Sequence, residues 1–463
     1  MKFDLEKIVV TVSFITSFLS VFLSNGIIIG VPAIASDFAM NNVIQNWVPT
    51  IFFLVVAVFT VPAGQISGKF GVKKSLMVGI IIFLIGSIGA CVAFSTESFL
   101  FFRVIQGAGA AFLSVSAMAM VVSAVKPQNR GKALGFTITG VYLATSLSPV
   151  ICGFLVHNFS WKAMFYFVVP FLLLCLILMI LKMPQEWKTY EHDKIDIGGS
   201  ILYGLGILGF VYGFTTLNTM LGKILTVIGI ILLVVFGRYE LRQKSPVFNM
   251  NLFKNKKFTS SNIAALCSYI AVMVVTTILN YHFQYVRGWD AQMSGMILII
   301  TPIIMALIAP NSGKLSDKMH PQKIAAIGMS IATIAMLILT FLDGNTPLYF
   351  VILAMILQGI GMGLFTSPNM NAIMSSVPPK DAPTASASQA TMRTIGQTMS
   401  LGILTLVFAW IMGNLELSTQ YANMVVQSSQ IICGISTCAC ILAIFASLIG
   451  IKSTDKFNTE RPS

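Results

Sequence analysis

Two arginines, Arg103 and Arg393, stand inside long apolar stretches of the sequence. A cation within the hydrocarbon core of a membrane costs at least about 2.5 kcal/mol, so each guanidinium is expected to face a polar cavity or a partner. The 16 acidic residues all fall in polar segments or at the ends of the apolar stretches. No carboxylate is therefore available in the middle of a stretch to meet a lipophilic cation or to carry a proton.

Histidine and cysteine offer little clustered chemistry. The 4 histidines are His157, His192, His282 and His320, and only His157 and His282 lie at ends of apolar stretches, where they could titrate on a transport pathway. The 7 cysteines lie within or beside apolar stretches, without paired spacing in a loop, which favours packing over a disulfide or metal role. We therefore predict no catalytic residues, no metal ligands and no cofactor.

The composition of the chain is that of a membrane protein. It is 56% hydrophobic and only 10% charged, whereas soluble domains average roughly 25% charged residues. Apolar runs of about 18 or more residues recur from end to end, and each can cross a hydrocarbon core as a helix. The alternation of a barrel strand is absent, and lipid offers the backbone no hydrogen-bond partners, so helices are expected. The sequence predicts an all-α polytopic membrane protein.

About fourteen spans are expected from the apolar runs and their breakers. They lie near residues 8–31, 44–66, 75–94, 98–121, 133–156, 163–181, 197–216, 221–236, 259–281, 292–312, 324–342, 347–368, 387–411 and 430–451. The first run follows Lys2 and Lys7 as a secretory signal would. It is too long for a signal and has no small-residue cleavage site after it, which favours a retained span. Only a short polar break at residues 218–223 separates the seventh span from the eighth.

Basic residues set the expected topology, because short cytoplasmic loops collect Lys and Arg. Of the 29 basic residues, the alternate segments that would face outward hold only Lys162, Lys223 and Arg287. This asymmetry predicts an even number of spans in the cell membrane, with both termini cytoplasmic. The net charge of +13 then follows from topology, and no nucleic-acid partner is expected.

Glycine is expected to bring spans together. Helices in lipid associate by close packing, since lipid tails are as apolar as the side chains they would replace. Gly107 and Gly109, with alanines beside them, would let the fourth span approach a neighbour closely.

A short pattern occurs twice, after the second and the tenth expected spans. Residues 64–74 read Gly-Gln-Ile-Ser-Gly-Lys-Phe-Gly-Val-Lys-Lys, and residues 313–323 read Gly-Lys-Leu-Ser-Asp-Lys-Met-His-Pro-Gln-Lys. Each copy pairs a helix-ending glycine with a tight basic turn. Recurrence at corresponding positions of two halves is typical of transporters built from repeats.

Four stretches in order resemble the fourteen-span drug:proton antiporter branch of the major facilitator superfamily. Residues 64–74 resemble its motif A, and residues 102–111 resemble its motif B, with Arg and Gln-Gly kept. Residues 140–153 resemble its antiporter motif, and residues 160–165 resemble the stretch that follows it. Residues 239–258 resemble the connector between the eighth and ninth spans of that branch.

The departures from the family pattern concern charge and glycine. Gly68 stands where motif A has an aspartate, whereas Asp317 in the second copy keeps the acid. The antiporter motif has Ser148 and Cys152 in place of two glycines. Many relatives carry an acid in the first span, and this chain has Leu23-Ser24-Asn25 there instead. With two arginines and no embedded acid, neutral or anionic amphiphiles are expected over dications.

The resemblance implies two six-helix bundles that rock about a substrate site near mid-membrane, with two extra central spans. The implied parts are a bundle over residues 1–194, a two-span hairpin over 195–236, a basic cytoplasmic connector over 237–258, and a second bundle with a short tail over 259–463. The protein would transport a small molecule as a monomer in contact with membrane lipid, with protons as one coupling ion to consider.

The resemblance also implies site residues. Those expected to line the cavity are Asn25, Arg103, Gln106, Tyr142, Asn280, Gln284, Gln358, Asn369 and Arg393. Those expected to form the cytoplasmic gate are Gly64, Lys69, Lys73, Gly313, Asp317, Arg130, Lys132 and Asp381. In this gate Asp317 would lie near Arg130 and Lys132, while lysines of the first copy would find Asp381.

Three alternatives to a drug exporter remain. The chain could carry one particular metabolite or lipid precursor in either direction. A membrane-embedded enzyme would need clustered polar residues at a cavity, and the scattered histidines provide none. A channel is disfavoured by the repeated gating turns, and saturable flux would separate it from a transporter.

Overall fold

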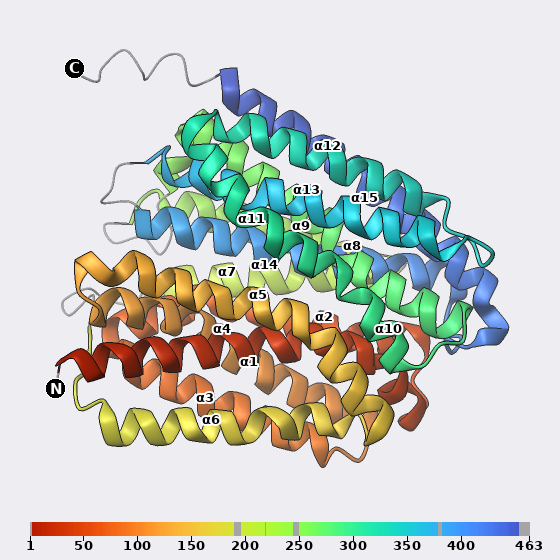
Figure 1. The fold of residues 1–463 in the computed structure, drawn as a ribbon, viewed down its shortest axis with the longest axis horizontal. Helices are drawn as coiled ribbons and strands as arrows, with labels where there is room; N and C mark the ends of the chain where they lie inside the picture. Colours follow the sequence, from red (N-terminus) through yellow and green to blue (C-terminus); the bar gives the residue numbers. More distant parts are fainter. Residues whose placement is uncertain (1, 189–195, 218, 244–249, 378–381, 453–463) are drawn as a thin grey trace. The chain divides into compact units, whose positions relative to one another are not determined.

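The computed structural model describes residues 2–188, 196–217, 219–243, 250–377 and 382–452, and these residues contain helices and no strand. Fourteen helical segments in them are long and apolar enough to cross a membrane. Figure 1 shows long helices joined mostly by short loops. The all-α polytopic fold expected from the composition is confirmed.

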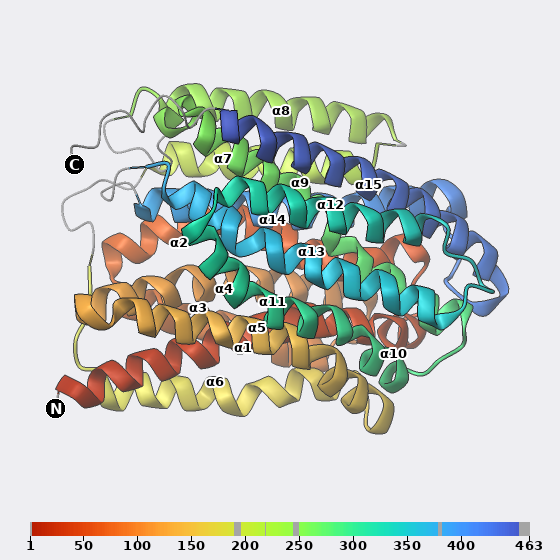
Figure 2. The same cartoon turned by 45° about the horizontal axis from the view of Figure 1, so that its top comes forward.

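The chain forms two compact units. The first comprises Met1–Phe236 together with Trp289–Met296 and Asn414–Glu416. Its helices are α1 (Lys2–Asp37), α2 (Asn42–Phe70), α3 (Val72–Cys91), α4 (Thr96–Ala124), α5 (Pro127–Asn158), α6 (Lys162–Lys182), α7 (Ile197–Thr215) and most of α8 (Met220–Glu240). Within this unit α3 and α2 pack against α4, and α1 packs against α5, as Figure 2 shows.

The second unit comprises Gly237–Gly288, Ile297–Gly413 and Leu417–Ser463. Its helical elements are η1 (Met250–Lys254), α9 (Lys256–Tyr281), the π-helical turn η2 (His282–Val286), the end of α10 (Ala291–Leu298), α11 (Ile300–Lys318), α12 (Pro321–Thr340), α13 (Leu348–Met374), α14 (Ala382–Met412), η4 (Thr419–Tyr421) and α15 (Ala422–Lys452). Here α12 and α11 pack against α13, and α14 and α15 pack against α9.

Glycines allow helices to approach closely in each unit. A Cβ atom built on Gly109 of α4 would lie 2.5 Å from the backbone nitrogen of Phe83 in α3. A Cβ atom on Gly361 of α13 would lie 2.7 Å from the backbone nitrogen of Ala332 in α12. A Cβ atom on Gly107 would lie 2.8 Å from the carbonyl oxygen of Phe52 in α2. The close approach predicted for the glycines of the fourth span is confirmed, and the second unit repeats it.

Polar side chains begin several of the spans. Asn41 accepts a hydrogen bond from the backbone of Ile44 at 2.9 Å, and Ser95 forms a capping box with Ser98. Such caps satisfy donors that the first turn of a helix leaves without intrahelical partners. With these caps, α2 and α4 begin at Asn42 and Thr96, two residues before the expected spans. The first span also ends later than expected, at Asp37 rather than residue 31.

The seventh and eighth spans, which only a short polar break separates in the sequence, are both present. The seventh covers Ile197–Thr215 and the eighth covers Met220–Glu240, so the even number of spans is kept among the described residues. The tenth span, Ala291–Gly313, is interrupted between α10 and α11. The expected part boundaries at residues 194, 236 and 258 stay predictions.

Candidate functional site

In the first unit, Arg103 lies on α4 and its side chain is fully buried. Its Nε donates a hydrogen bond to the carbonyl oxygen of Val48 in α2 at 3.3 Å. Its guanidinium lies 4.5 Å from the centre of the Phe52 ring, and its Nη1 donates to the side-chain oxygen of Gln106. A carbonyl, an amide and a ring face thus stabilise this cation where no carboxylate is available.

Gln106 continues the network from α4 to α3. Its Nε2 donates to the hydroxyl oxygen of Ser87 at 2.8 Å, and that hydroxyl donates to the carbonyl of Phe83 at 2.7 Å. One nitrogen of Arg103, Nη2, has no hydrogen-bond partner among the described residues. Arg103 and Gln106, both expected to line a cavity, are therefore enclosed between packed helices in this conformation, and one buried donor is left over.

Asn25 and Tyr142 lie on the packed pair α1 and α5, and both are half-buried. The side-chain nitrogen of Asn25 donates to the hydroxyl of Thr145 at 3.5 Å, one turn beyond Tyr142. Cys152, which replaces a family glycine on α5, packs against Gly26 of α1, where a Cβ atom would overlap its sulfur. The glycine missing from one helix is thus supplied by the other.

In the second unit, two of the four expected amide residues contact each other, and the other two lie apart on one helix. The Nε2 of Gln284 donates to Oδ1 of Asn280 at 2.8 Å, which joins the end of α9 to the π-helical turn η2. Gln358 and Asn369 lie three turns apart on α13, and each is 2% exposed. Oδ1 of Asn369 has no hydrogen-bond partner among the described residues.

Arg393, the remaining expected cavity residue, lies on α14 and is only half-buried. The structure therefore separates the two arginines that the sequence presents alike. One is enclosed by a hydrogen-bond network, and the other stays partly open.

The two candidate histidines both have partners. Nδ1 of His157 lies 3.8 Å from a carboxylate oxygen of Asp290. Nε2 of His282, a buried residue, accepts from Nε of Arg287 at 3.0 Å, and Arg287 also donates to the carbonyl of Thr346. Burial lowers the pKa of Arg287. Because Nε2 of His282 accepts a hydrogen bond, this nitrogen carries no proton in the observed arrangement.

The first copy of the repeated pattern forms the turn from α2 to α3. Gly64 is half-buried on α2, and the ammonium of Lys69 lies 6.0 Å from the Phe70 ring centre. Gly71 has φ of 116°, a conformation that favours glycine, and it offers α3 no side-chain cap. The ammonium of Lys73 donates to the carbonyl of Met183, just beyond α6.

Glu186, one of the acidic residues outside the expected spans, caps α3 from the segment after α6. Its carboxylate accepts from the backbone N–H of Lys73 at 2.8 Å and of Lys74 at 3.1 Å. The N–H of Val72 donates to the carbonyl of Trp187 at 2.8 Å. The sequence offers one indication of such a cap, because Lys73 and Lys74 place two positive charges at the positive end of the α3 dipole. An acid from another segment would stabilise this helix end.

The second copy and the gate are described only in part. Gly313 is half-buried on α11, and one turn later the side-chain nitrogen of Asn371 in α13 donates to the hydroxyl of Ser316 at 2.9 Å. The side chains of Asp317, Arg130 and Lys132, and all of Asp381, lie outside the described residues. The pairing expected among them stays a prediction.

The titratable and thiol side chains of the described residues lie apart from one another. Within it, no three His, Cys, Asp or Glu residues gather closely enough to hold a metal ion. The cysteines are free, and all but Cys267 and Cys438 are buried. The buried positions agree with the packing role expected for cysteine.

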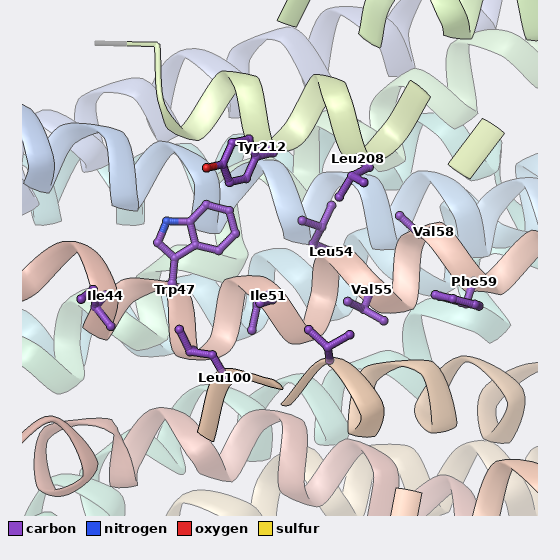
Figure 3. A pocket seen from close by; sticks show the side chains of 11 residues that line it. Ile44, Trp47, Ile51, Leu54, Val55, Val58, Phe59, Leu100, Leu208 and Tyr212 are labelled. Atoms are coloured by element: carbon purple, nitrogen blue, oxygen red, sulfur yellow. The ribbon is translucent and has the colours of Figure 1, made fainter. Parts of the chain in front are cut away.

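An apolar cavity of about 490 Å³ lies in the first unit between α2, α4 and α7. Figure 3 shows Trp47 and Tyr212 together at one end of it, and their ring centres are 5.5 Å apart. Its other lining residues are aliphatic or phenylalanine side chains. None of the expected site residues lines it, so it can hold an apolar group but offers almost nothing to orient a polar one.

The fold and motifs define a class of protein. The Major Facilitator Superfamily profile matches residues 13–401, and the chain belongs to that family. It is a multi-pass membrane protein and a secondary transporter, and the names of its family and relatives point to a transporter rather than to an enzyme.

Relatives with printed names are transporters. The chain is 28% identical over 433 residues to "Riboflavin transporter RibZ" of Clostridioides difficile, covering 92% of this chain and 93% of the relative. It is 25% identical to "Multidrug resistance protein Stp" of Mycobacterium tuberculosis, covering 84% of this chain and 73% of the relative. It is also 25% identical to "Multidrug resistance protein 3" of Bacillus subtilis, covering 82% and 78%.

Solved structures share the fold at low identity. A bacterial homologue of the human lysosomal transporter Spinster, in an inward-facing and unoccupied conformation, superposes with a TM-score of 0.72 at 16% identity, covering 97% of this chain and 98% of that one. A POT family transporter in complex with 5-aminolevulinic acid superposes with a TM-score of 0.73 at 15% identity, covering 97% and 96%. These likenesses support the transporter fold alone.

Proposed function

We propose that this chain exports small neutral or anionic amphiphilic molecules by alternating access. One observation carries the proposal: the carboxylates that fall within the described spans are Glu6, Asp37, Glu97 and Glu240, and each lies within two residues of a span end. Arg103 and Arg393 lie deeper. An interior with cations and no carboxylate disfavours cationic drugs and favours neutral or anionic ones.

The names of two relatives and the sequence resemblance described above support efflux. Two relatives are named for multidrug resistance, and the fourteen spans resemble the drug:proton antiporter branch. We accordingly propose that the protein works as a monomer in the cell membrane with both termini cytoplasmic. The proton is the coupling ion to test, although the usual embedded acid of that branch is missing.

A second candidate is transport of one particular metabolite with a flavin-like ring. A relative that covers 92% of the chain is named as a riboflavin transporter. Riboflavin is an uncharged planar amphiphile, which agrees with the charge argument for the first candidate. The two candidates therefore differ in the breadth of substrates that they accept rather than in the charge of the substrate.

Everted membrane vesicles from cells that express the chain would test both. Labelled riboflavin and a panel of neutral, anionic and cationic amphiphiles would be offered with and without an imposed pH gradient. Saturable, gradient-dependent accumulation of several neutral or anionic compounds is expected. Accumulation of riboflavin alone would favour the second candidate, and accumulation of cations alone would contradict both.

A further inference from the structure

The first half of α14 carries a polar stripe, defined as Gln389, Arg393 and Gln397. These residues recur every four positions, so they lie on one side of the helix, and each is partly exposed. They belong to the span Ser388–Met412. An arginine between two amides would be costly against lipid, so the stripe must face polar surroundings while the protein is in the membrane.

Two hydrogen bonds hold α14 to α9 on either side of Arg393. The hydroxyl of Ser388 donates to Oδ1 of Asn262 at 2.9 Å. Further along, the backbone N–H of Val274 donates to the hydroxyl of Ser400 at 3.0 Å. Both bonds are buried, so the two helices form a fixed seam and the position of Arg393 along it is set.

Close packing at this seam places Tyr269 of α9 beside the stripe. A Cβ atom on Gly396 would lie 2.8 Å from Cβ of Tyr269, so the helix backbones approach closely just past Arg393. The Tyr269 hydroxyl forms a hydrogen bond with the Gln389 side chain and has an electrostatic interaction with Arg393. A phenol, two amides and a guanidinium are thereby gathered on one partly open surface of the second unit.

Arg393 is the charged member of this group, and its donors have no hydrogen-bond partner among the described residues. Within the described residues it has an electrostatic interaction with Tyr269, and neither a hydrogen bond nor an ion pair with another side chain. Arg103, in contrast, donates to two acceptors. A guanidinium presents several N–H donors in a fork that fits the two oxygens of an oxyanion.

We infer that Arg393, with Gln389, Gln397 and Tyr269, forms a subsite for an anionic group of the transported molecule. The inference rests on the proposed export function and narrows its substrates to amphiphiles that carry an oxyanion. Arg393 supplies the charge, and the amides and the phenol position the oxyanion within reach of its N–H groups.

Two xanthene dyes of opposite charge provide the test, because fluorescein is anionic and rhodamine 6G is cationic on the same ring frame. Initial transport rates below saturation would be measured in proteoliposomes that hold the full chain. Arg393→Gln is expected to lower the fluorescein rate by about tenfold, the loss expected for a hydrogen bond to a charged group. The slower rate expected for cationic rhodamine 6G should not fall, because the substitution removes a charge that repels this dye. Arg393→Lys should retain part of the fluorescein rate.

The matched control is Arg238→Gln, which removes the same charge from an exposed position on α8. It should change neither rate. An equal fall in both dye rates for Arg393→Gln would indicate a structural role and overturn the subsite, as would an unchanged ratio of the two rates. Gln397→Leu gives a second readout should Arg393→Gln fail to accumulate, and it should lower the fluorescein rate severalfold.

Fluorescence anisotropy of fluorescein with the purified full chain separates this subsite from the export proposal. Binding that Arg393→Gln weakens by about tenfold would support the subsite even where no dye is transported, and in that case only the export proposal fails. Binding that the substitution leaves intact would overturn the subsite whatever the transport result. Competition by phosphatidylglycerol in place of substrate would assign the oxyanion to lipid and also overturn it.

Discussion

Removing the carboxylate of Glu186 should loosen the first turn of α3. Glu186→Ala deletes an acceptor that two backbone N–H groups use, at 2.8 and 3.1 Å. The side chain is half-buried. Loss of a capping acid of this kind costs about 1–2 kcal/mol, and since about 1.4 kcal/mol is tenfold, local opening should become about 5- to 30-fold more frequent.

Hydrogen–deuterium exchange of the peptide that begins α3 would measure this opening directly. Faster exchange is expected at Val72, Lys73 and Lys74 and not in the middle of α3, because the cap acts on the first turn alone. Gly71→Ala should produce the same local change, since its Cβ atom would overlap the Glu186 carboxylate and its φ of 116° is strained for alanine.

The matched control is Glu97→Gln, which removes an exposed acid from the first turn of α4 while the Ser95 capping box remains. It should leave exchange in α3 at the wild-type level. Exchange that is unchanged at Lys73 and Lys74 in Glu186→Ala would refute the assignment of Glu186 as the cap. Uniformly faster exchange throughout α1–α6 would instead mean that Glu186 supports the whole first unit.

Four further outcomes are expected. Gly109→Val should lower the free energy of unfolding by about 1–3 kcal/mol or prevent folding, because the new Cβ atom meets the α3 backbone. Gly135→Ala should not, because a Cβ atom at this position has nothing within 4 Å. Equal melting temperatures of the two variants would contradict this expectation. Gln106→Leu should lower the free energy of unfolding by about 1–3 kcal/mol, because it leaves Nη1 of Arg103 without its acceptor. Ser87→Ala should lower it by less, because it removes only the acceptor of Gln106. The reverse order in thermal-shift measurements would refute the network. Single cysteines at Lys254 and Gly413 should label from opposite sides of the membrane, Lys254 from the cytoplasm; labelling of both from outside would refute the topology. Cells that express the chain should gain little resistance to divalent quaternary ammonium compounds, and strong resistance would show the charge argument to be wrong.

The fold could be predicted from the sequence because each span must satisfy its own backbone in lipid. Length and hydropathy therefore give both the number and the type of the elements, even for the short hairpin on either side of residue 218. The close contacts of the fourth span could also be predicted, because small residues let a neighbouring helix approach whichever helix it is. Helix ends were less predictable, since polar caps such as Asn41 and Ser95 carry the helices past the apolar runs.

The candidate site was less accessible to sequence reasoning, because a side chain's partners come from other helices. Asn25 pairs with Thr145, which is 120 residues away, and Glu186 caps a helix that begins 114 positions before it. Nothing near Glu186 in the sequence indicates that partner. The gate residues around Asp317 and Asp381 lie outside the described side chains, so the family resemblance alone still supports their pairing.

The two intramembrane arginines show why residue type cannot decide between a structural and a recognition role. Arg103 has an acceptor at i+3 on its own helix, a carbonyl of α2 within reach and a ring beneath its guanidinium. Its charge is therefore largely met inside the first unit, and replacing it should chiefly change stability. Arg393 has amides at four positions before and after it, and it keeps its donors partly exposed. Because a guanidinium within a membrane span must face polar surroundings, the arginine whose donors stay partly exposed is the one whose partner is expected to arrive and leave with the substrate.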